Sequence, residues 1–303
     1  MKKIYRMLVA GSIIFNLTAI CVLALGSNNL TMTFEFGDKG RGNGQFGYLP
    51  VAVRPLAFDK EGCIYLIDSE NHRVQKFNSN GEFIMAFGNF GCEDGEFNYP
   101  SRITIDASGN IYILDTYNGA YVKNLQQINQ VISYPRIQKF SPNGEFICSF
   151  GGTGKGAGCF LGIPADVATD SNGNIFIVDA GNHRIQKFGP DGKFVSAFGN
   201  YGTGPAELDN PKFIEIDNQD NIFIFDAGSK NCRIVKFAPD GTFLSTFGKE
   251  GYEDGQFTGA VLDMFIDEQG NLRVVGGFSW SSSDTVGTPC RMNIKNSTQM
   301  AVF

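Results

Sequence analysis

Apolar residues along most of this chain follow a pattern typical of β-strands. Short runs rich in isoleucine, valine, phenylalanine and tyrosine, such as 64–68, 111–115 and 175–179, alternate with glycine, asparagine, aspartate and proline. β-Branched and aromatic residues fit a pleated sheet, and the intervening residues favour turns. No window beyond the N-terminus keeps a 3.6-residue period, so the pattern predicts an all-β chain.

One short sequence returns five times. Its clearest copy, at residues 179–199, reads DAGNHRIQKFGPDGKFVSAFG. Each copy holds four strand-like runs joined by tight-turn residues, and repetition at this period indicates stacked units. Four-stranded antiparallel sheets repeated in this way predict a β-propeller, because a closed ring hides the sheet edges. We assign the copies to residues 46–88, 97–151, 160–199, 208–248 and 257–303.

The copies resemble the NHL repeat, whose signature stands here as Asn71-His72-Arg73 and Asn182-His183-Arg184. The resemblance covers residues 31 to about 277 and implies a propeller, usually of six blades in this family. Because five repeats are detectable, we expect five or six blades. Residues 31–37 match the last strand of a unit and are expected to close the ring as an outer strand. Residues 290–295 and 299–303 compete with them as degenerate third and fourth strands of the last blade.

The N-terminus is predicted to form a hydrophobic helix. Lys2, Lys3 and Arg6 precede an uncharged run over residues 7–25, which as a helix would reach about 28 Å, close to the thickness of a bilayer core. Small residues at 24 and 26 resemble a cleavage site, so residues 1–26 are either a signal peptide or a membrane anchor. Either alternative places the propeller, residues 27–303, outside the cytoplasm, secreted or tethered through residues 7–25.

The charge of the chain argues against nucleic acid as a partner. Its net charge is −6, whereas nucleic-acid binders usually display a basic stripe. The repeated lysines are expected to be spread around the ring, one per blade: Lys76, Lys139, Lys187 and Lys236. The RNA binding known for some animal NHL propellers is therefore disfavoured.

Two candidate metal motifs are better explained as parts of the repeat. His72 and His183 occupy the same repeat position in different blades, whereas a zinc site needs three or four ligands close together. Residues 170–174 begin like a calcium loop, but Gly181 stands where a bidentate glutamate is required. We interpret both as structural.

Alternation along the innermost strand of each copy selects side chains for the central channel. These are Asp166, Glu215 and Asp263, with Arg102 as their basic partner. One interpretation is a calcium site, because lactonase-like six-bladed propellers hold calcium in such a channel. The chain would then be a metal-dependent lactonase- or lyase-like hydrolase in which Arg102 steadies a substrate carboxylate or oxyanion. The other, which we favour, is a hydrated channel with a structural Arg102–Asp166 pair and no cofactor.

Insertions break the repeat between the second and third strands of copies two and five. Loops at this position share one face of a propeller, here called the long-loop face, with the glycine-rich connections between blades. Loops that depart from a repeat often carry function, and aromatic side chains are strong anchors for partners. The sequence therefore favours a scaffold that binds a protein, peptide or glycan on this face over an enzyme. The candidate ligand-binding residues are Tyr117, Tyr121, Lys123, Tyr134 and Trp280, with Arg102 from the channel.

Overall fold

Strands dominate the computed structural model, as the alternation predicts. Among the described residues, the helical segments are two short 3-10 turns, η1 (Ser69–Asn71) and η3 (Ala180–Asn182). No helix among the described residues is long and apolar enough to cross a membrane. The structure describes residues 20–25, 30–47, 55–118, 133–228, 231–251, 255–257, 261–267, 270–276 and 291–294.

Four antiparallel sheets of four strands follow one another along the chain. The first holds β5 (Leu56–Phe58), β6 (Ile64–Asp68), β7 (Arg73–Phe77) and β8 (Phe83–Phe87). The second holds β9 (Pro100–Ile105), β10 (Ile111–Asn118), β11 (Ser133–Phe140) and β12 (Phe146–Gly151). The third holds β13 (Val167–Thr169), β14 (Ile175–Asp179), β15 (Arg184–Phe188) and β16 (Phe194–Phe198). The fourth holds β17 (Pro211–Ile216), β18 (Ile222–Gly228), β19 (Asn231–Phe237) and β20 (Phe243–Phe247).

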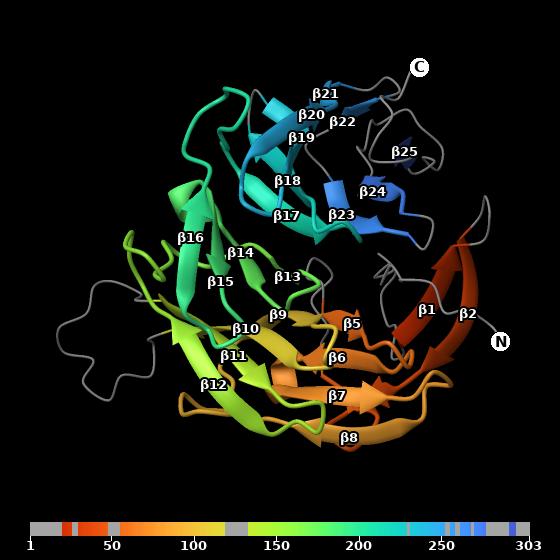
Figure 1. Cartoon of the computed structure of the whole chain (residues 1–303). Helices are drawn as coiled ribbons and strands as arrows, with labels where there is room; N and C mark the ends of the chain where they lie inside the picture. The colour runs from red at the N-terminus through yellow and green to blue at the C-terminus, as the bar shows by residue number, and fades with distance from the viewer. Residues whose placement is uncertain are drawn as a thin grey trace, which may run out of the picture.

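A fifth sheet of three strands completes the series. It consists of β23 (Val261–Ile266), β24 (Leu272–Gly276) and β25 (Arg291–Ile294). Pairing of β25 with β24 agrees with the expectation that residues 290–295 supply a third strand. The five sheets succeed one another around a common centre, as expected for a propeller (Figure 1).

The connections between blades share one geometry. Each outer strand leads into a glycine-rich loop closed by a short parallel contact, seen in β3 (Asp38–Lys39) with β4 (Gln45–Phe46) and β21 (Lys249–Glu250) with β22 (Gln256–Phe257). Single bridges Phe90–Phe97, Thr153–Phe160 and Tyr201–Leu208 repeat it in the other connections. Gly88 (φ 90°) opens one of these loops, and a Cβ there would collide with the Phe97 ring. Glycine is therefore required at this turn.

The hydrophobic core lies between neighbouring sheets. Every residue of β14 is buried, because this second strand of its blade is covered on both faces. Between the first and second sheets, Ile67, Phe97, Ile113 and Phe140 belong to one buried cluster. A separate cluster fills each following gap, so the stability of the chain is distributed over the contacts between blades.

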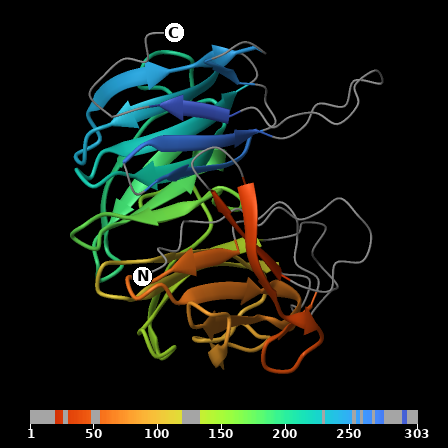
Figure 2. The ribbon, with the colours of Figure 1, turned by 90° about the vertical axis from the view of Figure 1, so that its right-hand side faces the viewer.

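The N-terminal predictions need correction. Residues 7–19 of the expected helix lie outside the described residues, and residues 20–25 form strand β1 (Ile20–Leu25), so the helix is not confirmed. The expected closing strand, β2 (Leu30–Phe36), pairs with β1 instead of the fifth sheet. Pairing two strands that are joined by a short connection costs less loop-closure entropy than pairing strands from opposite ends of the chain. The β1–β2 hairpin lies between the fifth and first sheets (Figures 1 and 2).

Candidate functional site

The long-loop face has a buried aspartate on the second strand of each of the first four blades, and the fifth blade has Gly276 at this position. The carboxylate of Asp115 is fully buried and accepts hydrogen bonds from the backbone N–H groups of Asn98 and Tyr99. Its other oxygen lies 3.1 Å from a guanidinium nitrogen of Arg136. Burial raises the pKa of Asp115, and the Arg136 charge and the two N–H groups act in the opposite direction. The equivalent residues in the other blades are Asp68, Asp179 and Asp226, all fully buried.

Both histidines fasten this face to the blade that follows. His72 and His183 adopt left-handed backbone conformations with φ of 54° and 55°. Their Nδ1 atoms lie 2.8 and 2.6 Å from the carbonyl oxygens of Asn98 and Asp209, and each ring lies 4.7 Å from an aromatic ring of the connection. The two imidazoles thus make equivalent structural contacts in different blades. Among the described residues, no group of three His, Cys, Asp or Glu side chains could hold a metal ion.

The second sheet brings two of the predicted ligand-binding residues together. Tyr117 on β10 pairs directly with Tyr134 on β11, where these strands extend beyond the rest of the sheet. The Tyr134 side chain is exposed. The other residues proposed for this face, Tyr121, Lys123 and Trp280, lie outside the described residues.

Two residues predicted to face the central channel, Arg102 and Asp166, lie close together. The Nε atom of Arg102 lies 3.6 Å from Asp166 Oδ1. That carboxylate is 2 % exposed and accepts hydrogen bonds from the backbone N–H groups of Val167 and of Ile214, on β17. Asp166 therefore links the inner parts of three blades, which supports a structural role for the pair.

The other two channel carboxylates do not join this pair in a metal-binding group within the described part of the chain. Glu215 on β17 is buried, and Asp263 on β23 accepts a hydrogen bond from the backbone N–H of Met264. The calcium site stays a prediction.

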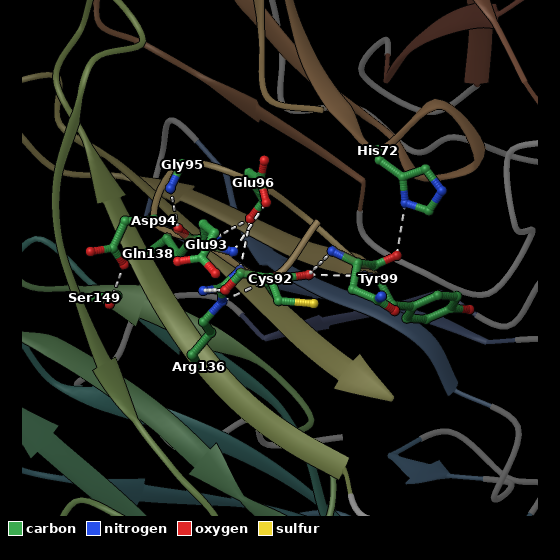
Figure 3. Close-up of polar contacts among 12 residues, drawn as sticks. His72, Cys92, Glu93, Asp94, Gly95, Glu96, Tyr99, Arg136, Gln138 and Ser149 are labelled. Carbon is green, nitrogen blue, oxygen red and sulfur yellow. Dashed lines mark hydrogen bonds and ion pairs between the residues drawn. The ribbon is translucent and has the colours of Figure 1, made fainter. Parts of the chain in front are cut away.

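An acidic loop between the first two blades, hydrogen-bonded to β11 and β12, was not singled out by the sequence patterns. Arg136 Nη1 donates to the carbonyl oxygen of Cys92, and Gln138 Nε2 donates to that of Glu96. The Gly95 N–H donates back to Gln138, and the Ser149 hydroxyl donates to the carboxylate of Asp94 (Figure 3). The sequence Glu93-Asp94-Gly95, which returns as Glu253-Asp254-Gly255, was the signal available in the sequence.

One buried hydroxyl at the base of the Tyr117–Tyr134 extension has no hydrogen-bond partner. Thr116 is 2 % exposed, and its Oγ1 atom is unsatisfied. Ser69, at the same position of the first blade, donates its hydroxyl to the Pro100 carbonyl. The structure thus offers a matched pair of hydroxyls, one bonded and one unbonded.

Thr116→Val is therefore expected to raise the free energy of unfolding by about 1 kcal/mol, because it removes an unsatisfied polar group and keeps the β-branched shape. Ser69→Ala is expected to lower it by about 1 kcal/mol, because a buried acceptor loses its donor. Urea unfolding of both variants measures the difference. A destabilised Thr116→Val protein would show that this hydroxyl has a partner, such as a water molecule.

The chain is similar to known repeat proteins over limited segments. Residues 161–188 match the NHL repeat, and residues 53–124 match a family described as a 6-bladed beta-propeller. "Protein brain tumor" of Drosophila melanogaster is 26% identical over 145 residues, which are 48% of this chain and 12% of that protein. NHL repeat-containing protein 3 of Homo sapiens is 30% identical over 95 residues, 28% of this chain and 27% of that protein. The chain thus spans a minor part of the length of both relatives.

Solved structures share the fold at low identity. Virginiamycin B lyase from Staphylococcus aureus superposes with a TM-score of 0.53 at 14% identity and covers 93% of this chain and 78% of its own. A protein of unknown function from Bacteroides caccae gives a TM-score of 0.53 at 12% identity, with 88% and 80% covered. At such identities the likeness shows the propeller fold alone.

Proposed function

We propose that this chain, an NHL-repeat β-propeller, is a scaffold that binds a protein, peptide or glycan on its long-loop face. The observation that carries the proposal is a set of exposed aromatic side chains on that face. Large aromatic side chains left in water commonly anchor partners. They are Tyr201, Phe90, Tyr99 and Tyr134, exposed to 68%, 49%, 48% and 43%.

The rigidity of the face supports this proposal. The buried aspartates hold the connections through backbone N–H groups, and the two histidines tie turns to the next blade. Binding to a surface that is already ordered loses less conformational entropy than binding to a mobile one. In the channel, by contrast, the best candidate carboxylate, Asp166, is engaged by Arg102 and two backbone N–H groups. The binding function is therefore preferred to the hydrolase.

The proposal includes a location outside the cytoplasm. It rests on Lys2, Lys3 and Arg6 before the uncharged run 7–25, a pattern of exported or anchored proteins. The partner would accordingly be an extracytoplasmic molecule.

Site-specific photocrosslinking tests the proposed face. A benzophenone amino acid is placed at position 134, and cells that express the protein are irradiated. Discrete covalent adducts are expected, because this exposed side chain lies at the proposed interface. The matched control carries the same probe at Leu244, which is about equally exposed on the outer strand β20. Mass spectrometry of the adducts reads out the partner.

Changing Tyr117 and Tyr121 to alanine together should reduce the adducts at position 134 at least tenfold, as expected for removal of two aromatic anchors that are each worth about 1–2 kcal/mol. The melting temperature should stay the same. Equal adducts from positions 134 and 244, or adducts that persist in the double variant, would contradict the site.

A further inference from the structure

The third connection between blades differs from the others at one point of an otherwise constant loop. The connections are residues 37–46, 88–97, 151–160, 199–208 and 248–257, and they align without a gap. Their ninth position holds, in this order, Gln45, Glu96, Cys159, Glu207 and Gln256. We propose that the third connection binds the carboxylate group of an external ligand, in the place where the other loops hold a side-chain oxygen of their own. This inference goes beyond the binding through Tyr117 and Tyr134 and does not depend on it.

The loop backbone binds that side-chain oxygen directly. In three connections, the N–H group of the sixth residue donates a hydrogen bond to the side chain of the ninth. The donor–acceptor pairs are Gly42–Gln45 at 3.0 Å, Glu93–Glu96 at 3.1 Å and Gly204–Glu207 at 2.8 Å. We call the sixth to ninth residues of a connection, with this N–H group, the acceptor cradle. Backbone N–H groups of glycine-rich turns are common binding sites for anions.

The cradle favours a negative charge. The backbone N–H of Glu93 and the side chain of Asn89 lower the pKa of Glu96, since hydrogen bonds to the charged form stabilise it. A backbone N–H also bonds a carboxylate more strongly than it bonds a neutral acceptor. The cradle therefore already serves as a carboxylate-binding element in the second and fourth connections.

The backbone of the third connection is held in the same way as the others. Arg184 Nη2 donates to the carbonyl oxygens of Gly156 and Cys159, the sixth and ninth residues, at 2.7 and 3.0 Å. Arg73 and Arg233 make the same pair of contacts in the first and fourth connections. The third cradle therefore has the geometry of the cradles that bind an oxygen.

Cys159 does not fill this third cradle. A Cβ placed on the fourth residue of any other connection would collide with the side-chain oxygen, whereas on Gly154 it would lie 3.5 Å from Cys159 Cβ. A Cβ placed on the sixth residue would lie 2.9 Å from that oxygen at Gly42 and 3.0 Å at Gly204. At Gly156 it would meet nothing within 4 Å. The short thiol side chain thus leaves the Gly156 N–H without the acceptor of the other loops, and leaves room for a ligand.

The charge around the third cradle suits a carboxylate. Residues 151–163 contain Lys155 and no acidic residue, and both Lys155 and Gly156 are exposed. Because Lys155 directly precedes the donor residue, its ammonium can pair with a carboxylate that the Gly156 N–H holds. The Arg184 guanidinium adds no net charge, since it pairs with the buried Asp179. The ligand class is therefore an organic acid with an accessible carboxylate.

An NMR titration of the full chain, labelled with ¹⁵N-glycine, with sodium propionate at constant ionic strength tests the inference. The Gly156 N–H signal, assigned from its loss in Gly156→Ala, should shift and saturate with a dissociation constant on the order of millimolar. Cys159→Gln should weaken binding at least tenfold, because its own amide oxygen then fills the cradle as in the first connection. Cys159→Ser keeps a short side chain and should stay within twofold. Lys155→Gln should weaken binding at least threefold.

A shift that does not saturate, or one that persists unchanged in Cys159→Gln, would overturn the inference. Tighter binding of inorganic phosphate than of propionate would also overturn it, because phosphate would then replace carboxylate as the ligand class. A melting curve of Cys159→Gln that matches the unmodified protein excludes unfolding as the cause of its loss. Absence of crosslinks at position 134 would refute the proposed binding face and leave this titration unaffected, so the two failures are distinguishable.

Discussion

Replacing Asp166 by alanine is expected to lower the free energy of unfolding by about 3–5 kcal/mol, the usual effect of breaking a buried ion pair from one side. The reason is the position of the carboxylate between three blades. It faces the Arg102 guanidinium of the second blade and accepts the Ile214 N–H of the fourth. Alanine leaves both donors in the channel without this acceptor. Calorimetry should record a melting temperature lower by roughly 6–20 °C.

A double-mutant cycle with Arg102→Met distinguishes the pair from the backbone contacts. Asp166→Ala should be less damaging in the Arg102→Met background, because no uncompensated guanidinium remains. A strictly additive cycle would show that the ion pair contributes nothing and that the N–H groups account for the loss. If Asp166 were instead a calcium ligand, the unmodified protein would melt higher in calcium than in chelator, and the variant would not. That result would restore the hydrolase interpretation.

The fold was largely predictable because the same strand-like runs and turn residues recur in the five copies of the repeat. Turn residues mark the ends of short apolar runs, and the structure has strands at 64–68, 111–118 and 175–179 where those runs lie. Counting by twos along the inner strands also predicted that Arg102 and Asp166 would meet. Alternation fixes which face a side chain joins, and neighbouring blades then fix its partner.

Two features could not be obtained from pattern alone. The pairing of β2 depends on a competition between a nearby strand and a distant one, which the strand-like residues of 31–37 do not reveal. The hydrogen bonds from Arg136 to the carbonyls of Cys92 and Glu96 depend on how a connection folds back onto β11, and such tertiary contacts have no periodicity.

The repeated lysines illustrate the same limit. The sequence indicated that they would be spread around the ring, but not what they do there. Lys139 Nζ donates to the Pro190 carbonyl of the next blade, and Lys187 Nζ donates to that of Pro239. The Lys139 ammonium also lies over the Tyr112 ring of its own blade, and the Lys187 ammonium lies over the Phe176 ring of its own blade. These two cations therefore join neighbouring blades.

The aspartate that ends the second strand should be the most sensitive repeat position, and Asp179→Ala tests it. One carboxylate oxygen accepts hydrogen bonds from Arg184 Nε at 2.8 Å, Asn182 Nδ2 at 2.8 Å and Gln186 Nε2 at 3.0 Å. The other accepts the Leu161 N–H at 3.2 Å. The side chain is fully buried, so no water can replace it without rearrangement. We expect Asp179→Ala to lose about 3–5 kcal/mol in urea unfolding.

Asp179→Asn discriminates between charge and shape as the source of that loss. The amide keeps one acceptor oxygen but turns its NH₂ group toward a donor in either orientation, and it no longer balances Arg184. Its loss should therefore approach that of alanine, since the site is built to receive N–H groups from both sides. Asp191→Asn in the exposed turn of the same blade is the control and should leave the unfolding midpoint unchanged. An asparagine variant as stable as the unmodified protein would show that hydrogen-bond geometry, and not the buried charge, holds the third blade to its connection.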